Sequence, residues 1–359
     1  MTDDGWKDYL DPEKEWPMSS KGESEQPAEH IGVPTEMAAA AAVVSNWGRW
    51  GRNDEIGTLN YISADRVRRA AEHVRKGITF SLSIPFDAYG PQGAHGIRRN
   101  PIHLMSLDGG DHDLSERLGD WGGAAEEQVA EVWRGPFRFN DDYIMMPLQA
   151  ATQWDALAHV YYDKQLYNGF SSDSTTSFGA RRDGIDKVAA AGGVVGRGVL
   201  LDVARHFGVD HLEAGSTIRP DDLDAVVARQ AVELDVGDVL LVRTGWWLHY
   251  LQSRDASSWG PTAPGIGWRC AEWLHDKQIA AIACDNVAVE SSTKEFPGVT
   301  LPFHMLAIRD MGMMLGEMWN LENLAQDCAD DHVYEFMLVA QPLLISGAVG
   351  SPINPLAIK

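Results

Sequence analysis

The sequence lacks the features that mark several large classes of protein. Its three cysteines, Cys270, Cys284 and Cys328, are too few and too widely spaced for a disulfide framework or a zinc ribbon. It has no run of about 18 apolar residues, so we expect no transmembrane helix. The first residues show neither the basic region nor the apolar region of a signal peptide. We therefore expect a cytoplasmic protein with reduced thiols.

Positive charge is also scarce. The chain has 30 Lys and Arg residues against 52 Asp and Glu residues, which gives a formal net charge of -22. Such a charge repels phosphate backbones and anionic membrane surfaces, so we expect a small-molecule substrate rather than nucleic acid or a membrane. Of the 359 residues, 44% are hydrophobic and 23% are charged, which is enough apolar material for a sizeable core.

The chain divides into a short polar start and one long globular part. Residues 1–35 are acidic and polar, and predict an extended N-terminal arm. Residues 36–359 are interpreted as a single domain in which strand and helix patterns alternate, which is typical of an α/β fold. The pattern predicts a helix capped by Ser63, strands at 78–84, 199–203, 239–244, 279–284 and 336–339, helices from Pro220 and at 268–275, and a long loop at 87–113.

The densest group of polar side chains lies between residues 149 and 159. Gln149, Gln153, Asp155 and His159 interrupt an otherwise apolar segment, and on a strand these odd-numbered residues would share one face. Two amides, a carboxylate and an imidazole are tolerated in apolar surroundings only when they bind one another or a metal ion. The spacing alone leaves both interpretations open, a hydrogen-bonded core network and a metal site.

A second polar pair, His304 and Glu317, lies near the C-terminal end. Glu317 comes just after the apolar run 313–315, at the kind of position where an α/β fold places functional side chains. Taken alone, each residue is more typical of a structural role. The sequence contains no glycine-rich dinucleotide fingerprint, no P-loop and no Gly-x-Ser-x-Gly elbow, so nucleotide or serine-nucleophile chemistry has no support.

These segments carry a resemblance to the cyclase-like metal-dependent hydrolases, the family of kynurenine formamidase and isatin hydrolase. The family motif is H-x-G-T-H-x-D-x-P-x-H, and Thr152, Asp155 and His159 match it in register. Gln149 and Gln153 stand where the family has its first two histidines. The Gln form resembles a branch represented by trans-dienelactone hydrolase. Further similar segments extend the resemblance from about Gly48 to Lys359: 54–60, 198–202, 238–245, and His304 with Glu317, Asn320 and Leu321.

The resemblance implies a compact α/β fold, with a mixed β-core flanked by helices, that assembles as a homodimer or a larger homo-oligomer. It also implies roles for the site residues. Asp155, His304 and Glu317 would bind a divalent metal ion, together with Gln149 and Gln153, and His159 would transfer protons. Because amide oxygens are harder and poorer zinc donors than imidazole, the two Gln residues favour Mn²⁺ relative to Zn²⁺.

The implied function is hydrolysis of a lactone or another small cyclic substrate by metal-activated water. Trp47, Trp246 and Tyr167 are candidates to contact the substrate, although packing is the simpler interpretation for each. One alternative is an amidase or arylformamidase acting on N-formyl or cyclic amide substrates. A second alternative is a metal-free binding protein that lost its site together with the two histidines.

Overall fold

The computed structural model describes residues 32–93, 96–111 and 136–359. Residues Pro34–Lys359 form one compact unit. The arm predicted for residues 1–35 lies almost wholly outside the described residues. Within the described ranges, no helix combines the length and the apolar character needed to cross a membrane.

Short strands and helices follow one another along the chain, with several strands in succession near both ends of the described part. The strands are β1 (Thr79–Ser81), β2 (Ile102–Leu107), β3 (Asp141–Met145), β4 (Gln153–Asp155), β5 (Thr175–Thr176), β6 (Gly179–Ala180), β7 (Val195–Asp202), β8 (Thr217–Ile218), β9 (Val239–Arg243), β10 (Gly265–Ile266), β11 (Ala281–Cys284), β12 (Met314–Glu317), β13 (Glu335–Val339), β14 (Gly350–Pro352) and β15 (Leu356–Ile358). The α-helices are α1 (Thr35–Val44), α2 (Ala64–Ala70), α5 (Ile185–Ala190), α6 (Val203–His206), α7 (Pro220–Gln230), α8 (Trp246–Ser253), α9 (Ala256–Trp259), α10 (Cys270–Asp276), α11 (Pro302–His304) and α12 (Glu322–Asp331). The 3₁₀-helices are η2 (Gly57–Tyr61), η3 (Ala71–His73), η4 (Tyr167–Gly169) and η5 (Ser172–Ser174), and η6 (Met305–Met311) is a π-helix.

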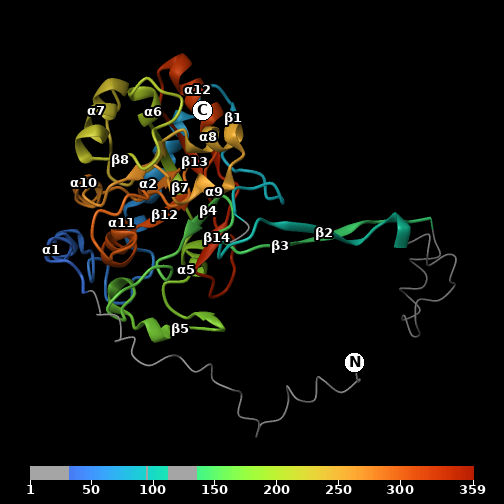
Figure 1. The fold of residues 1–359 in the computed structure, drawn as a ribbon, viewed down its shortest axis with the longest axis horizontal. Helices are drawn as coiled ribbons and strands as arrows, with labels where there is room; N and C mark the ends of the chain where they lie inside the picture. Colours follow the sequence, from blue (N-terminus) through green and yellow to red (C-terminus); the bar gives the residue numbers. More distant parts are fainter. Residues whose placement is uncertain (1–31, 94–95, 112–135) are drawn as a thin grey trace, which may run out of the picture. The chain divides into compact units, whose positions relative to one another are not determined.

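The core is a nine-stranded mixed sheet in the order β1-β15-β13-β7-β9-β11-β12-β4-β14. Its centre, β7-β9-β11-β12, is parallel, and the strands on both sides join antiparallel. All residues of β9 and β11 are buried, as expected for parallel strands covered on both faces by helices. Figure 1 shows the helices packed around these central strands. The structure thus confirms the predicted α/β class with a mixed β-core.

The sheet curls until its two edges meet. β14 lies at one edge and β15 lies next to the other, yet three residues, 353–355, separate them along the chain. Such a link spans at most about 14 Å, so the two edges must be close in space. The backbone confirms this, because Ile353 N–H donates to Thr152 O at 3.0 Å and Leu82 N–H donates to Pro355 O at 2.9 Å.

Most predicted elements are present, with three differences. Ser63 caps α2 as predicted, but the α-helix ends at Ala70 and continues only as the short turn η3. The strand predicted over 78–84 is limited to β1. The predicted loop at 87–113 contains β2, whose residues are exposed apart from Leu107. β2 pairs with β3 in a ribbon separate from the main sheet (Figure 1). Its apolar residues do not alternate regularly, because the pairing shifts register between Met105 and Leu107.

Candidate metal centre

The strand β4 brings the first polar group to the sheet. It lies between β12 and β14, with Gln153 opposite Glu317 and Asp155 opposite Leu315 of β12. Residues paired across a ladder point to the same face, and side chains alternate along a strand. Gln153, Asp155 and Glu317 therefore share one face of the sheet, while Trp154 points to the other.

Packing of Trp154 on the opposite face of the sheet fixes the register of β4 relative to β12. Trp154 is fully buried, packs against Trp319 with ring centroids 5.0 Å apart, and donates its Nε1–H to Ala340 O at 2.8 Å. Gly316, the partner of Trp154 in β12, leaves room for both indoles. A Cβ atom there would lie 2.8 Å from each of them and 2.5 Å from Ala283. A one-residue slip would place Trp154 on the polar face, so this packing fixes which side chains face the site.

The distal pair, His304 and Glu317, lies close to Asp155 of β4, as the family resemblance implies. Asp155, His304 and Glu317 each have a ligand atom within 4.8 Å of the others, and all three are buried. Glu317 Oε1 lies 3.3 Å from His304 Nε2, and Glu317 Oε2 accepts from Gln153 Nε2 at 2.5 Å. Two carboxylates and an imidazole around one point form a donor set that suits a divalent transition-metal ion.

His304 is oriented by a residue that the sequence analysis missed. Its Nδ1–H donates to Glu290 Oε2 at 2.7 Å, and its backbone N–H donates to the same oxygen at 2.8 Å. Nε2 faces Glu317, and a metal ion bound there would take the place of the proton that this nitrogen otherwise carries. A carboxylate behind the far nitrogen is the usual arrangement for a metal-binding histidine. Nothing local to Glu290 in the sequence indicates this role.

Two buried polar atoms at the centre lack a hydrogen-bond partner among the described residues. They are Asp155 Oδ2 and Gln153 Oε1. The Gln153 amide donates from Nε2 to Glu317 and also lies 3.3 Å from Asp155 Oδ1. A rotation of the amide would exchange its oxygen and nitrogen, and would add a carbonyl oxygen to the two carboxylates. Buried unpaired oxygens are costly, and a cation would satisfy them, so the residues present fit a metal ion.

The pKa shifts of Asp155 and His304 reflect an excess of carboxylate groups at this buried site. Burial, together with the nearby Glu317 charge, raises the pKa of Asp155 well above its usual value. Burial lowers the pKa of His304, but hydrogen bonds to Glu290 and Glu317 outweigh it and raise this pKa to about 10. Two carboxylates this close favour a proton on one of them, as expected for this pair without metal.

His159, the predicted proton-transfer residue, lies beside the cluster. Its Nε2 is 3.6 Å from Asp155 Oδ1, and its side chain is 21% exposed. Burial lowers its pKa to about 4, so the imidazole is neutral and able to accept a proton at neutral pH. The strand assumed for 149–159 is wrong, because β4 covers only three residues. His159 follows in a turn, in which its backbone N–H donates to Ala156 O at 2.9 Å.

Gln149 also lies outside β4, in the turn before it. Its side-chain amide packs close to Gly350, where a Cβ atom would lie 2.6 Å from Nε2. Its backbone carbonyl accepts from Arg98 Nη1 at 3.1 Å, and the same nitrogen lies 3.4 Å from Glu317 Oε2. Arg98 is a second site residue that the sequence analysis missed. A ligand role for the Gln149 side chain stays a prediction.

The three aromatic candidates are placed mainly by packing. Trp246 and Tyr167 are buried, and they donate to Trp259 O at 2.9 Å and to Asp54 Oδ2 at 3.0 Å. Trp47 is half-buried and donates from Nε1 to Arg309 O at 2.8 Å. Among the described residues, none of these polar contacts is to the metal cluster. A substrate contact for the three stays a prediction.

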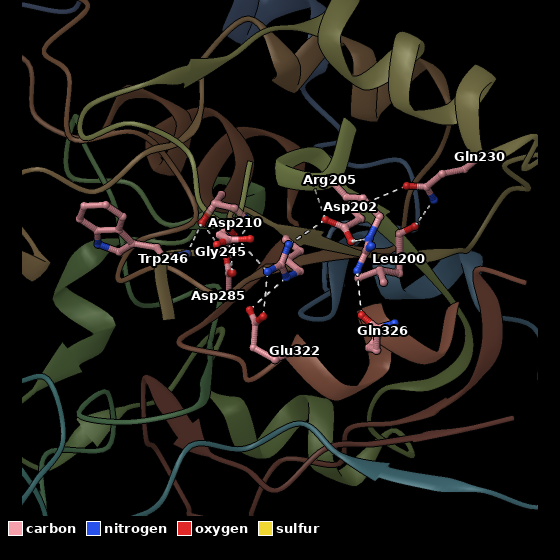
Figure 2. Close-up of polar contacts among 12 residues, drawn as sticks. Leu200, Asp202, Arg205, Asp210, Gln230, Gly245, Trp246, Asp285, Glu322 and Gln326 are labelled. Carbon is pink, nitrogen blue, oxygen red and sulfur yellow. Dashed lines mark hydrogen bonds and ion pairs between the residues drawn. The ribbon is translucent and has the colours of Figure 1, made fainter. Parts of the chain in front are cut away.

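A separate polar network lies at the ends of the parallel strands (Figure 2). Arg243 at the end of β9 pairs with Asp202 at 3.0 Å and with Glu322 at 2.7 Å. Asp285, which follows β11, accepts from the N–H groups of Thr244 and Gly245 at 2.8 and 2.7 Å. Each of these charged groups thus has a polar partner within the network. The Trp246 indole points away from them. Asp285 therefore stabilises the junction between β9 and α8.

Comparison with known proteins now assigns the family. A family model described as a putative cyclase matches residues 80–291, which is more than half of the chain and includes β4, His159 and Glu290. The chain belongs to this cyclase family. A solved structure titled as a novel cyclase is 41% identical, with a TM-score of 0.76, over 88% of this chain and 100% of its own. A search of curated proteins finds no match.

More distant solved structures share the fold. Isatin hydrolase A from Labrenzia aggregata, bound to benzyl benzoate, is 18% identical with a TM-score of 0.54, over 80% of this chain and 94% of its own. An isatin hydrolase bound to the product analogue thioisatinate is 16% identical with a TM-score of 0.54, over 82% of this chain and 98% of its own. At these identities the likeness shows the architecture alone. The comparisons give no separate support to the dienelactone hydrolase branch.

Proposed function

We propose that the protein is a metal-dependent hydrolase that attacks the carbonyl group of a lactone or another small cyclic substrate with water. The observation that carries this proposal is the buried cluster of Asp155, His304 and Glu317 within 4.8 Å, with unpartnered oxygens beside it. Membership of the cyclase family and the shared fold of the isatin hydrolases support it.

Asp155, His304 and Glu317 would hold the ion, and the carbonyl oxygen of Gln153 would join them after rotation of its amide. The ion would polarise a carbonyl group and lower the pKa of a water molecule. A set richer in oxygen than in nitrogen favours Mn²⁺ relative to Zn²⁺. Glu290 would keep a proton on Nδ1 of His304 while Nε2 exchanges its own proton for the ion.

His159 would take the proton from the attacking water and return it to the leaving group. Its neutral imidazole lies at the edge of the cluster and is partly exposed, so it can reach both the cluster and a bound substrate. Asp155 lies 3.6 Å from Nε2 and would stabilise the imidazolium that forms. No covalent nucleophile is required, and the three cysteines are buried.

Elemental analysis combined with a substrate panel tests the proposal. We expect purified or Mn²⁺-reconstituted protein to hold near-stoichiometric metal and to hydrolyse lactones in preference to formamides and cyclic imides. Preference for an amide would replace the lactone assignment with the amidase alternative. Protein that holds no metal after reconstitution and hydrolyses no member of the panel would refute the enzyme assignment.

A further inference from the structure

A pocket of about 370 Å³ lies at the C-terminal end of β7, outside the metal centre. It is bounded by α6, α7, α12 and the segment that leads into β13. Its volume lies in the usual range of small-ligand sites, about 300–1,000 Å³. In the sheet, β7 is three strands from β12, which carries Glu317. At about 4.8 Å between neighbouring strands, the two strands are about 14 Å apart, so a small ligand in this pocket would not touch the metal cluster.

The side chains that line this pocket carry an excess of positive charge. The basic residues among them are Arg205, His206, Arg229 and His332. Asp202 is the one acidic residue among the described residues that line the pocket, and its carboxylate is already engaged. Asp202 Oδ2 lies 3.0 Å from Arg205 Nε (Figure 2), and Asp202 Oδ1 lies 3.0 Å from Arg243 Nη1. In a chain with a formal charge of -22, a pocket of this sign favours anions.

Both arginines have N–H groups that remain available to a ligand. Arg229 donates from Nη1 to His206 O at 2.8 Å, and its Nε and Nη2 have no partner among the described residues. Arg205 donates from Nε to Asp202 and from Nη2 to Gln326 Oε1 at 3.3 Å, which leaves Nη1 (Figure 2). The existing contacts hold both guanidinium groups in place, so they lose little freedom when a ligand binds. The planar fork of a guanidinium matches the oxygens of a phosphate or carboxylate group.

Tyr334 brings a buried hydroxyl group to the same pocket. The residue is 8% exposed and lines the pocket just before β13. Its hydroxyl has no hydrogen-bond partner among the described residues, and a buried hydroxyl without a partner is costly. Burial and the charge of Asp202 raise the pKa of Tyr334. The charges of Arg205 and Arg229 are near enough to lower this pKa in part, so the hydroxyl and the two guanidinium groups lie close together.

The donors of this pocket come from three separate parts of the fold: Arg205 from α6, Arg229 from α7 and Tyr334 from the segment before β13. From this geometry we infer that the pocket binds the phosphate group of a small phosphate monoester. Phosphate oxygens accept hydrogen bonds from several directions, and a charge of about -2 matches two guanidinium groups. The apolar side chains of Val226 and Ala329 also line the pocket and suit the carbon part of such a ligand. This site is independent of the proposed hydrolase function.

Calorimetric titration of glycerol 3-phosphate into the full-length protein tests the site directly. We expect the wild type to bind this probe, Arg229→Ala to bind it at least tenfold more weakly, and Tyr334→Phe at least threefold more weakly. Arg229 is exposed, and phenylalanine keeps the ring of Tyr334, so both variants should fold. Arg68→Ala is the matched control and should bind like the wild type, because Arg68 is an exposed arginine of α2 that pairs with Asp65. Wild-type protein that does not bind the probe, or an Arg229→Ala affinity within threefold of wild type, would overturn the inference.

Two further titrations separate this pocket from the metal centre and phosphate from other anions. Because phosphate can also bind a metal ion, the titration is repeated with Asp155→Ala, and we expect an unchanged affinity. Loss of binding in Asp155→Ala together with full binding in Arg229→Ala would place the probe at the metal centre and overturn the inference. Succinate carries two carboxylate groups in place of the phosphate, and we expect it to bind at least tenfold more weakly. Succinate that binds as tightly as glycerol 3-phosphate would overturn the phosphate assignment.

Discussion

The carboxylate behind His304 offers a direct test of how the metal centre is built. We expect Glu290→Gln to weaken Mn²⁺ binding about 10- to 100-fold, which corresponds to about 1.4–2.7 kcal/mol. Glu290 is 4% exposed and His304 is 2% exposed, so little water is available to replace the lost charge. An amide oxygen at position 290 still accepts from the His304 backbone, which keeps the local fold. Glu290→Ala would leave two buried donors unpaired and destabilise the fold by about 2–4 kcal/mol.

Competition with a chelator, followed at constant pH, measures this loss of affinity. Glu295→Gln is the control, because Glu295 is a nearby carboxylate that accepts from Trp268 N–H and makes no contact with His304. We expect that variant to bind Mn²⁺ like the wild type. Equal affinities for wild type and Glu290→Gln would refute the idea that Glu290 orients His304 for a metal ion. An equal loss in Glu295→Gln would attribute the effect to net charge.

Four further changes test other parts of the structure. His159→Ala should abolish turnover and leave metal content nearly intact, and loss of metal from this variant would make His159 a ligand. Asp155→Ala should lose metal and activity together, so retained metal would remove Asp155 from the ligand set. Burial, with Glu55 and Asp54 nearby, raises the pKa of Asp183 to about 8, so its contribution to stability is present below about pH 4 and is lost as the pH rises towards 8. Because Asn tolerates the left-handed φ of 58° at this position, Asp183→Asn should stabilise the protein by about 1–3 kcal/mol at pH 7 and not at pH 4, as measured by urea unfolding; no gain at pH 7 would contradict this. Arg243→Met should cost about 3–5 kcal/mol of stability, against at most about 0.5 kcal/mol for exposed Arg68→Met, and similar losses in both would contradict a buried network.

The parallel core was predictable because its signals are local. β7, β9 and β11 are short apolar runs, and α7 begins at Pro220 with acidic residues in its first turn. β2 was not predictable, because a register shift between Met105 and Leu107 interrupts the alternation of its apolar residues. The short span of β4 was missed for a different reason. Its length depends on β12 and β14, which are distant in the sequence.

The residues of the candidate site, like the strands, could be predicted from the sequence only in part. Asp155, His159, His304 and Glu317 stood out as polar residues in apolar segments, the family resemblance supplied their roles, and the structure brings them together. Their meeting depends on the antiparallel insertion of β4 beside β12, which no local pattern encodes. Arg98 reaches Glu317 across 219 positions of sequence, and its neighbourhood in the chain contains no regular period.

The closure of the sheet has a consequence for how the protein is made. β14 completes one edge beside β4, and β15 joins β1 to β13 near the other. A ribosome releases residues 350–358 after all the groups of the metal centre have already emerged. A chain that folds up to β13 during synthesis would leave one edge of β4 open until these residues emerge. During that interval β4 can pair with a strand of another chain, so slow translation near this point should favour aggregation before the centre can bind its ion.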